Sequence, residues 1–375
     1  MVEWKKLGEV MKIVRGASPR PITSYLTSDS NGVNWIKIGD VEPGAKYITR
    51  CIEKVTKEGA QKSRYLHSGD FVLSNSMSFG RPYILKIDGC IHDGWIAMSD
   101  FETHLSSGYL YEVLNSNRVQ SYWKMKANNG GAMTNLNSDI VKDTIIPIPS
   151  LEEQTRIVGI LDTFTSAIDN LKEQIAQRRK QYEYYRDQLL DLEGKPGVEM
   201  NKIAHLVKER IIAQTLTKEN YTSVENLLKD KAGRKDAENV PSEGNWIKYQ
   251  ENDVLIGNIR PYLRKIWLSD REGGTNGDVI VVRTNDSYLS KYIYYCLSSE
   301  RFFLYYNQAL KDGKMPRGEK SRLLNYVIPN INKVEQQRIV GILDTFAASI
   351  ANLEAQLEQR QKQYEYYRNK LLTFE

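Results

Sequence analysis

The amino-acid sequence predicts an α+β protein in which two globular domains alternate with two long coiled-coil helices. Two observations support this prediction. A segment in the middle of the chain returns 182 residues later at the C-terminal end, and both copies have the heptad spacing of a coiled coil. The stretches before them have short apolar runs broken by Gly, Pro, Asn and Asp, which is typical of strands and loops. The repeated unit is therefore a globular domain followed by a helix.

The repeat is strongest between residues 153–193 and 335–375, where 27 of 41 positions are identical. Weaker echoes are Asn-Trp-Ile-Lys from Asn34 and from Asn245, Arg-Pro-Tyr from Arg81 and from Arg260, and an alignment of residues 2–7 with residues 198–203. The chain thus divides into a first globular domain, a first helix, a second globular domain and a second helix, at residues 1–149, 150–193, 194–331 and 332–375.

Each long helix has a start signal. Ser150 and Glu153 form a capping-box pattern, and Asn332 and Glu335 form a looser version of it. The first helix is expected to stop at the Gly194-Lys195-Pro196-Gly197 turn.

The apolar seam of both helices alternates steps of four and three residues, which predicts a coiled coil. At 1.5 Å per residue each helix is roughly 60 Å long and needs a partner. We expect the two copies to pack antiparallel within one chain about a pseudo-twofold axis; pairing between two chains is the alternative. The seam residues are Ile157, Leu161, Phe164, Ile168, Leu171, Ile175, Arg178, Tyr182, Tyr185, Leu189 and Leu192, then Ile339, Leu343, Phe346, Ile350, Leu353, Leu357, Arg360, Tyr364, Tyr367, Leu371 and Phe374.

The globular halves read mainly as short strands, with one or two helices near residues 109–126 and near residues 288–306. Each half is therefore expected to be a mixed α/β domain with a twisted sheet.

Composition narrows the class of protein. The net charge of +5 permits a polyanionic partner without requiring one. No apolar run reaches the ~20 residues of a membrane span, and the N-terminus lacks the apolar core of a signal peptide, so a cytoplasmic location is expected. Three scattered cysteines predict free thiols, and four isolated histidines give no metal-ligand spacing.

Several loops gather Arg, Lys, Asn and Ser, the side chains that contact phosphates and base edges in DNA complexes. Any one such loop could be an ordinary solvated turn, but five of them in two repeated domains favour binding. The candidate DNA-binding residues are Arg15, Ser18, Arg20, Asn75, Ser76, Ser78, Arg81, Lys124, Lys126, Asn128, Asn258, Arg260, Arg264, Lys265, Lys311, Lys314, Arg317 and Lys320.

Motifs of the common DNA-processing enzymes do not appear in the sequence. It has no Walker GxxxxGK[ST] string, no GxGxxG opening a βαβ unit and no adenine-methyltransferase [DN]PP[YF] box. No nucleophile–base pairing or nuclease-like acidic cluster stands out. We therefore predict no catalytic residue in this chain.

The repeated Glu-Gln-x-Arg-Ile-Val-x-Ile-Leu-Asp at the helix starts, following Ile-Pro-Ile-Pro in the first copy, resembles the conserved region of specificity subunits of Type I restriction–modification enzymes. The globular halves resemble target recognition domains, the first through Gly16-Ala17-Ser18-Pro19, residues 35–40 and Ser68-Gly69-Asp70. The second half departs from this pattern, because it has no Gly-x-Ser-Pro string and no Gly-Asp after Lys248.

The resemblance implies a non-catalytic recognition subunit. Each domain would read one half of a split DNA target from the major groove, and the coiled coil would set the unread gap. The implied partners are double-stranded DNA, two methyltransferase subunits and two restriction subunits, with S-adenosylmethionine, ATP and magnesium bound by those subunits and no cofactor in this chain. Internal symmetry would let one chain dock two identical partners. The candidate partner-binding residues are Glu153, Gln154, Arg156, Glu335, Gln336 and Arg338.

Two other functions stay open at this point. One is a structural coiled-coil scaffold, and the other is a self-contained nuclease or methyltransferase. The divergence of the globular halves beside nearly unchanged helices disfavours the scaffold, and the missing motifs disfavour the enzyme.

Overall fold

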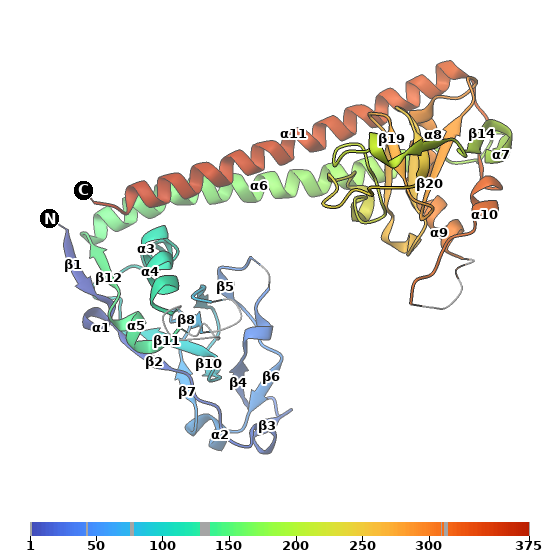
Figure 1. The fold of residues 1–375 in the computed structure, drawn as a ribbon. Helices are drawn as coiled ribbons and strands as arrows, with labels where there is room; N and C mark the ends of the chain where they lie inside the picture. Colours follow the sequence, from blue (N-terminus) through green and yellow to red (C-terminus); the bar gives the residue numbers. More distant parts are fainter. Residues whose placement is uncertain are drawn as a thin grey trace. The chain divides into compact units, whose positions relative to one another are not determined.

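The computed structural model describes residues 2–42, 44–75, 79–127, 136–308, 310 and 314–374 (Figure 1). The chain divides into two compact units. Unit 1 contains residues 1–171 and 356–375, and unit 2 contains residues 172–355. The long helices α6 (Leu151–Leu189) and α11 (Lys333–Leu371) each contribute one segment to each unit.

Unit 1 has two five-stranded sheets, ordered β3-β6-β4-β10-β7 and β2-β11-β8-β9-β5, and a separate antiparallel pair β1-β12. Its elements before α6 are β1 (Glu3–Lys6), α1 (Leu7–Val10), β2 (Lys12–Arg15), β3 (Leu26–Thr27), β4 (Val33–Ile36), β5 (Tyr47–Ile48), β6 (Glu53–Val55), α2 (Lys57–Gln61), β7 (Arg64–Leu66), β8 (Phe71–Ser74), β9 (Pro82–Leu85), β10 (Gly89–Ile91), β11 (Trp95–Ser99), α3 (Ser107–Leu114), α4 (Asn117–Ala127), α5 (Ser138–Lys142) and β12 (Ile145–Ile148).

Unit 2 has a four-stranded sheet, β14-β20-β17-β18, a three-stranded sheet, β15-β16-β19, and the pair β13-β21. Its elements between the long helices are β13 (Gly197–Glu199), α7 (Met200–Ile203), β14 (Ala204–Leu206), β15 (Arg210–Ile212), the short 3-10 helix Lys229–Lys231, β16 (Asn245–Tyr249), β17 (Val254–Gly257), β18 (Ile266–Leu268), β19 (Gly273–Thr275), β20 (Val279–Thr284), α8 (Ser290–Leu297), α9 (Glu300–Asn307), α10 (Lys320–Leu324) and β21 (Val327–Pro329).

The two units repeat one topology. The sheet order β2-β11-β8-β9 of unit 1 matches β14-β20-β17-β18 of unit 2, and α3, α4 and α5 match α8, α9 and α10. The helices expected near residues 109–126 and 288–306 are present, each as two helices. The repeat that is strong only in the long-helix sequences therefore extends through both globular domains.

One sequence alignment of the repeat is wrong by three residues. Strand β1 pairs Lys5 with Ile146, and β13 pairs Val198 with Ile328. Ile146 and Ile328 are the same position of the repeat, so Lys5 corresponds to Val198. Leu7 therefore corresponds to Met200, which is also fully buried, and not to Ile203. Short strands carry little sequence signal, and their register follows from the partner strand.

The long helices pack on each other within both units, and the segments that meet show that they run antiparallel. In unit 1, Phe164 of α6 stacks on Tyr367 of α11 with ring centroids 5.2 Å apart. In unit 2, Tyr185 of α6 stacks on Phe346 of α11 at 5.5 Å. These are the same two repeat positions with the helices exchanged, as a pseudo-twofold relation requires. The intrachain antiparallel pairing expected from the sequence is therefore confirmed.

The arginine that interrupts each seam has a defined place. The guanidinium of Arg178 lies 5.8 Å from the ring centroid of Phe346, and that of Arg360 lies 5.9 Å from Phe164. At this distance the cation is attracted by the face of the ring. The polar break in the heptads therefore makes the same contact in both units.

The core of each globular domain continues into the helix pair. In unit 1 one buried cluster joins the sheet β2-β11-β8-β9 and helix α3 to Ile157 and Leu161 of α6 and to Leu372, which directly follows α11. In unit 2 the corresponding cluster reaches Ile339 and Leu343. The sheet carrying the candidate loops is thus fixed to the coiled coil by apolar packing.

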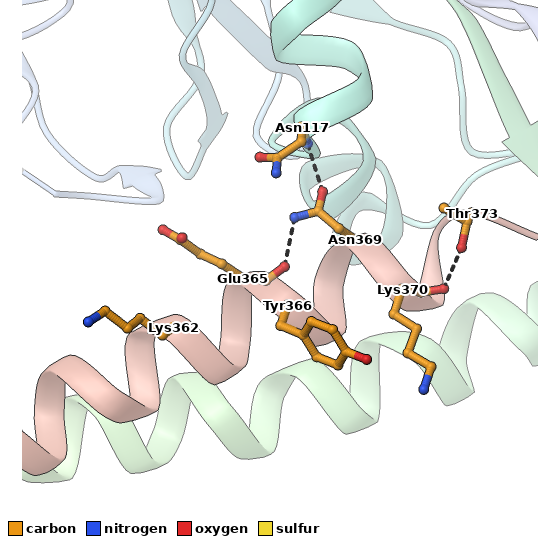
Figure 2. A pocket seen from close by; sticks show the side chains of 7 residues that line it. All are labelled: Asn117, Lys362, Glu365, Tyr366, Asn369, Lys370 and Thr373. Atoms are coloured by element: carbon orange, nitrogen blue, oxygen red, sulfur yellow. Dashed lines mark hydrogen bonds between the residues drawn. The ribbon is translucent and has the colours of Figure 1, made fainter.

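Polar contacts at this junction differ between the units. In unit 1 the hydroxyl of Tyr364 on α11 donates to the buried carboxylate of Glu112 on α3 at 2.7 Å. In unit 2 the corresponding position of α8 is Tyr295, whose hydroxyl donates to Asp344 of α11 at 2.5 Å. Figure 2 shows a further contact of unit 1, in which Asn369 of α11 accepts a 2.8 Å hydrogen bond from the backbone N–H of Asn117 at the start of α4.

We expect Glu112 to make the unfolding of unit 1 depend on pH. Burial raises the pKa of Glu112, and this outweighs the opposing hydrogen bond from Tyr364 and the charges of Lys46 and Arg368. A carboxyl whose pKa is higher in the folded than in the unfolded state stabilises the folded unit at low pH. This contribution to the free energy of unfolding is lost as pH rises from the unfolded pKa, near 4.5, through the folded pKa. Glu112→Gln should flatten the stability profile over this window, as measured by urea unfolding at a series of pH values.

The matched control for this prediction is Glu102→Gln, because Glu102 is an exposed glutamate of the same unit. Its profile should follow that of the unsubstituted chain. If the free energy of unfolding of Glu112→Gln depends on pH as steeply as that of the control, another group is responsible for the pH dependence.

Candidate nucleic-acid interface

In unit 1 several predicted DNA-binding residues meet at one turn between β10 and β11, around Asp93. The hydroxyl of Ser18 donates to the Asp93 carboxylate at 2.9 Å, and Nε of Arg15 donates to the Asp93 carbonyl at 3.1 Å. The amide of Asn75 donates to the same carbonyl, also at 3.1 Å. The hydrogen bond from Ser18 holds the pKa of Asp93 below its usual value. The loop after β2 and the loop after β8 are therefore tied to one acidic turn.

The members of this cluster differ in exposure. Arg20 has 85% of its side chain exposed and reaches Asp93 only at 3.6 Å, so its guanidinium can contact an external phosphate. Asn75 is buried, and its amide is engaged inside the unit. Asn75 therefore positions the loop, whereas Arg20 projects from it. Ser76, Ser78 and Asn128 lie outside the described residues.

The other unit 1 candidates lie on a second group of elements. Arg81 is exposed at the start of β9, with its guanidinium 5.8 Å from the ring centroid of Tyr83. Lys124 and Lys126 are exposed in the last turn of α4, where Lys126 lies 5.9 Å from the ring of Tyr122. None of these three side chains contacts Asp93.

In unit 2 the corresponding turn between β19 and β20 carries Asp278. Arg317 donates to its carboxylate at 3.0 Å through Nη2 and at 3.3 Å through Nε. The backbone N–H of Asn258 donates to the Asp278 carbonyl at 2.8 Å, as Asn75 N–H donates to Gly94 in unit 1 at 3.1 Å. The two units thus each tie their loops to an aspartate of this turn, although Asp278 occupies the position of Gly94 and the loop sequences differ.

Arg260 and Lys314 lie together beside this turn. Both Nε and Nη2 of Arg260 donate to the carbonyl of Lys314, at 3.3 Å and 3.2 Å. The backbone of Arg260 has the left-handed conformation, with φ of +49°, which non-glycine residues rarely adopt. Lys265 lines the same groove as Arg260 and donates to the Val224 carbonyl at 2.6 Å.

Three further DNA-binding candidates of unit 2 lie in other surroundings than Arg260 and Lys314. Asn258 is buried, and its side-chain oxygen accepts a 2.9 Å hydrogen bond from Tyr306. Arg264 points to a different groove and forms a 2.6 Å ion pair with Glu300. Lys320 is exposed at the first position of α10. Lys311 lies outside the described residues.

Sequence reasoning missed the two aspartates that organise these loops. Asp93 and Asp278 contact residues that are distant in the chain: Ser18 is 75 positions from Asp93, and Arg317 is 39 from Asp278. The available signal was an aspartate next to a glycine in this turn of each half, as Asp93-Gly94 and as Gly277-Asp278.

At the helix starts, the six candidate partner-binding residues divide into two kinds. Gln154 is fully buried; its Oε1 accepts from the N–H of Ser106 at 2.8 Å, and its Nε2 donates to the carbonyls of His104 and Pro149 at 2.8 Å and 3.0 Å. Gln336 is equally buried; its Oε1 accepts from the N–H of Leu289, and its Nε2 donates to the carbonyl of Ile331. These two side chains connect the start of each long helix to the globular domain of its unit by hydrogen bonds.

The remaining four residues form two surface ion pairs. Glu153 pairs with Arg156 and Glu335 with Arg338, each at 2.6 Å between the closest nitrogen and oxygen atoms. The arginine hydrogen bond lowers the pKa of both glutamates. The side chains of Arg156 and Arg338 are 55% exposed, so the helix starts present identical charge pairs in both units.

Among the residues that the structure describes, no three or more His, Cys, Asp or Glu side chains gather in a way that could hold a metal ion. No helix in this part is long and apolar enough to cross a bilayer. Cys90 and Cys296 are buried and Cys51 is half-buried, all as free thiols.

Comparison with known proteins gives consistent matches. The model of the Type I restriction modification DNA specificity domain matches residues 1–178. A putative Type I restriction enzyme specificity subunit of Haemophilus influenzae is 28% identical over 100% of this chain and 96% of its own length. A Type I restriction enzyme specificity subunit of Escherichia coli is 31% identical over 61% of this chain and 63% of its own length.

Solved structures share the fold. A chain from a Type I restriction–modification system aligns with a TM-score of 0.66 at 17% identity, covering 99% of this chain and 96% of its own. The HsdS subunit from Thermoanaerobacter tengcongensis aligns over 100% of this chain and 97% of its own, with a TM-score of 0.53 and 15% identity. Together with the repeated helix motif and the duplicated units, these matches make the chain similar, over its whole length, to specificity subunits of Type I restriction–modification systems.

Proposed function

We propose that this chain is the DNA-recognition subunit of a Type I restriction–modification complex, in which each globular domain reads one half of a split target. The observation that carries the proposal is the duplicated loop platform. One topology holds two different sets of polar loops at the same position beside Asp93 and Asp278. Two domains with one scaffold and different loops suit a target with two different halves.

The residues divide into those that shape the loops and those that reach outward. Asn75 and Asn258 are buried and hold their loops through internal hydrogen bonds. Arg20 and Lys124 are exposed and suited to phosphates or to base edges in a major groove. Lys314 is a comparable candidate in the second domain. Base specificity would follow from which exposed side chains and loop backbones enter the groove.

The chain would act without its own catalytic centre and would recruit the enzymes. We infer two methyltransferase subunits and two restriction subunits as partners, because the internal repeat offers two equivalent docking surfaces. The exposed pairs Glu153–Arg156 and Glu335–Arg338 are the proposed contacts at the helix starts. S-adenosylmethionine, ATP and magnesium would be bound by those subunits.

The test is a map of N6-methyladenine across the genome of cells that carry this chain with its methyltransferase subunit. Cells without this chain are the control. We expect a split motif that is methylated only when the chain is present, giving both half-sites and the gap.

The alternatives predict other results. A soluble complex with active methyltransferase and no new methylated motif would contradict DNA recognition and favour a scaffold. Methylation or nicking by the isolated chain would contradict the non-catalytic role.

A further inference from the structure

Arg260, in the turn between β17 and β18 of unit 2, has an exposed guanidinium group that is held without a carboxylate. Its Nε and Nη2 atoms both donate to the carbonyl of Lys314, at 3.3 Å and 3.2 Å. The two other arginines near this turn, Arg264 and Arg317, each form an ion pair with an acidic side chain. Among the described residues, Arg260 forms no such pair. Its guanidinium is therefore available to a ligand outside the protein.

The acidic side chains near Arg260 are Asp278 and Glu225, which line the same groove. One carboxylate oxygen of Asp278 accepts from two nitrogens of Arg317. Glu225 is exposed, and its charge acts on Lys265. The edge of a base is uncharged, so its recognition needs a directed pair of donors and not a surplus of positive charge. The balance of charges around this groove therefore does not oppose a contact with a base.

The backbone of Arg260 is held in a strained conformation by its neighbours. Arg260 and Arg264, at the two ends of the turn, both have left-handed backbones, with φ of +49° and +52°. The N–H of Arg260 donates to the carbonyl of Pro316 at 2.8 Å, and Ile259 forms an isolated antiparallel bridge with Arg317. Strained residues persist where the surrounding structure fixes them, and they are concentrated at ligand sites. The turn therefore presents Arg260 in one orientation.

The segment that carries Lys314 is attached to the same turn. The N–H of Gly318 donates to the carbonyl of Asn258 at 3.2 Å, and Tyr306 of α9 donates to the side-chain oxygen of Asn258 at 2.9 Å. A Cβ atom at Gly318 would lie 2.3 Å from the ring of Tyr306, so a side chain there would displace this buried ring. The carbonyl that holds the guanidinium of Arg260 therefore belongs to a segment that is anchored in the core of unit 2.

The way in which the guanidinium is held decides which of its edges is free. The group is planar, and its five N–H donors point in fixed directions. The Nε–Nη2 edge faces the carbonyl of Lys314, so the N–H groups of the Nη1–Nη2 edge remain without a partner among the described residues. Two parallel donors of this kind match O6 and N7 of guanine, which lie side by side in the major groove.

We propose that Arg260 determines the specificity of the second domain by reading one guanine in the major groove of its half-site. The inference rests on the proposed function and deepens it, because it names the base and the residue that reads it. Strand register and backbone hydrogen bonds place Asn258 at the position of Asn75. After these residues unit 2 continues with Ile259-Arg260-Pro261, whereas unit 1 has Ser76-Met77-Ser78. Only the second domain would therefore read a base with an arginine at this place.

The test measures binding of the full chain, in complex with its methyltransferase subunit, to duplexes that carry the methylated motif. Each guanine of the motif is replaced in turn by 7-deazaguanine, which keeps the base pair but lacks the N7 acceptor. We expect one guanine, in one half-site, at which this replacement lowers the affinity on the order of tenfold. In the Arg260→Gln complex the same replacement should have no effect, and the methylated motif should accept other bases at this position.

The outcome for all duplexes together separates base reading from a phosphate contact. A phosphate contact is insensitive to sequence, so Arg260→Gln would then weaken binding to every duplex equally and leave the motif unchanged. That result would overturn the assignment. Arg260→Asn is the second variant if Arg260→Gln fails to fold, because asparagine tolerates a left-handed backbone.

The matched control is Lys202→Gln, which removes one positive charge from an exposed position of α7 in the same unit. Its preference for the guanine should equal that of the unsubstituted complex. If no single 7-deazaguanine lowers the affinity, or if its effect persists in Arg260→Gln, the role of Arg260 is wrong and the proposed function stands. A complex that binds no duplex and confers no methylated motif would overturn both.

Discussion

Replacing Gln154 by alanine is expected to lower the free energy of unfolding of unit 1 by about 3 kcal/mol, because three buried backbone groups lose their partner. Ser106 N–H loses its acceptor, and the carbonyls of His104 and Pro149 lose their donor. Gln336→Ala removes two such hydrogen bonds in unit 2 and should cost about 2 kcal/mol. Urea unfolding measures both changes, and amide exchange of Ser106 and Leu289 should accelerate.

The controls for this prediction are the next residues in the helix. Thr155 and Gln337 are exposed and occupy one repeat position, so Thr155→Ala and Gln337→Ala should change stability little. A Gln154→Ala variant as stable as Thr155→Ala would mean that water replaces the lost hydrogen bonds. The identity of these glutamines between the copies would then need another cause, such as partner docking.

The helices were predictable because their signals are local. Ser150 accepts from the N–H of Glu153 at 3.3 Å, and Asn332 accepts from the N–H of Glu335 at 2.9 Å, as the capping patterns predict. In the first copy the second hydrogen bond of a capping box, from the backbone N–H of the cap residue to the glutamate, is replaced, because the Glu153 carboxylate binds Arg156.

The first helix ends at Leu189, five residues before the Gly194 turn that the sequence suggested. Nζ of Lys195 folds back and donates to the carbonyls of Leu189 and Asp191, at 3.1 Å and 3.0 Å. A cation that satisfies terminal carbonyls stabilises a helix end there. Such a contact depends on how the linker turns, which spacing alone does not reveal.

Near the same end, burial does not follow the predicted seam alone. Tyr185 and Tyr367 lie in the seam and stack on Phe346 and Phe164, yet they are 47% and 40% exposed, and the adjacent Arg186 is buried. A helix with 3.6 residues per turn drifts about 20° per heptad from a 3.5 repeat. The globular domain takes over as the packing partner there, so the buried face follows it.

The candidate interface was predictable in composition and not in assembly. Loops rich in Arg, Lys, Asn and Ser are visible in the sequence, yet the contacts of Asp93 and Asp278 join segments far apart in the chain. Long-range pairing, unlike helix periodicity, needs the fold to be known.

Shortening both long helices by one heptad is expected to shorten the gap between the half-sites and leave the half-sites unchanged. Removing residues 172–178 and 354–360 deletes the same repeat positions from both helices. The stacks of Phe164 on Tyr367 and Tyr185 on Phe346 obey one register, since each pair of residue numbers has the same sum, so the deletion keeps both. Seven residues at 1.5 Å amount to about 10 Å, or about three base pairs at 3.4 Å each.

The N6-methyladenine map of cells carrying the shortened chain gives the answer directly. The control deletes one heptad from a single helix, which breaks the register of the antiparallel pair and should abolish methylation, because seam residues no longer meet. If the helices set the spacing, the double deletion must restore methylation at a shorter gap. An unchanged gap with altered half-sites would mean that spacing is fixed by the recognition loops or by the partner subunits, and the coiled coil would then serve only to join the two units.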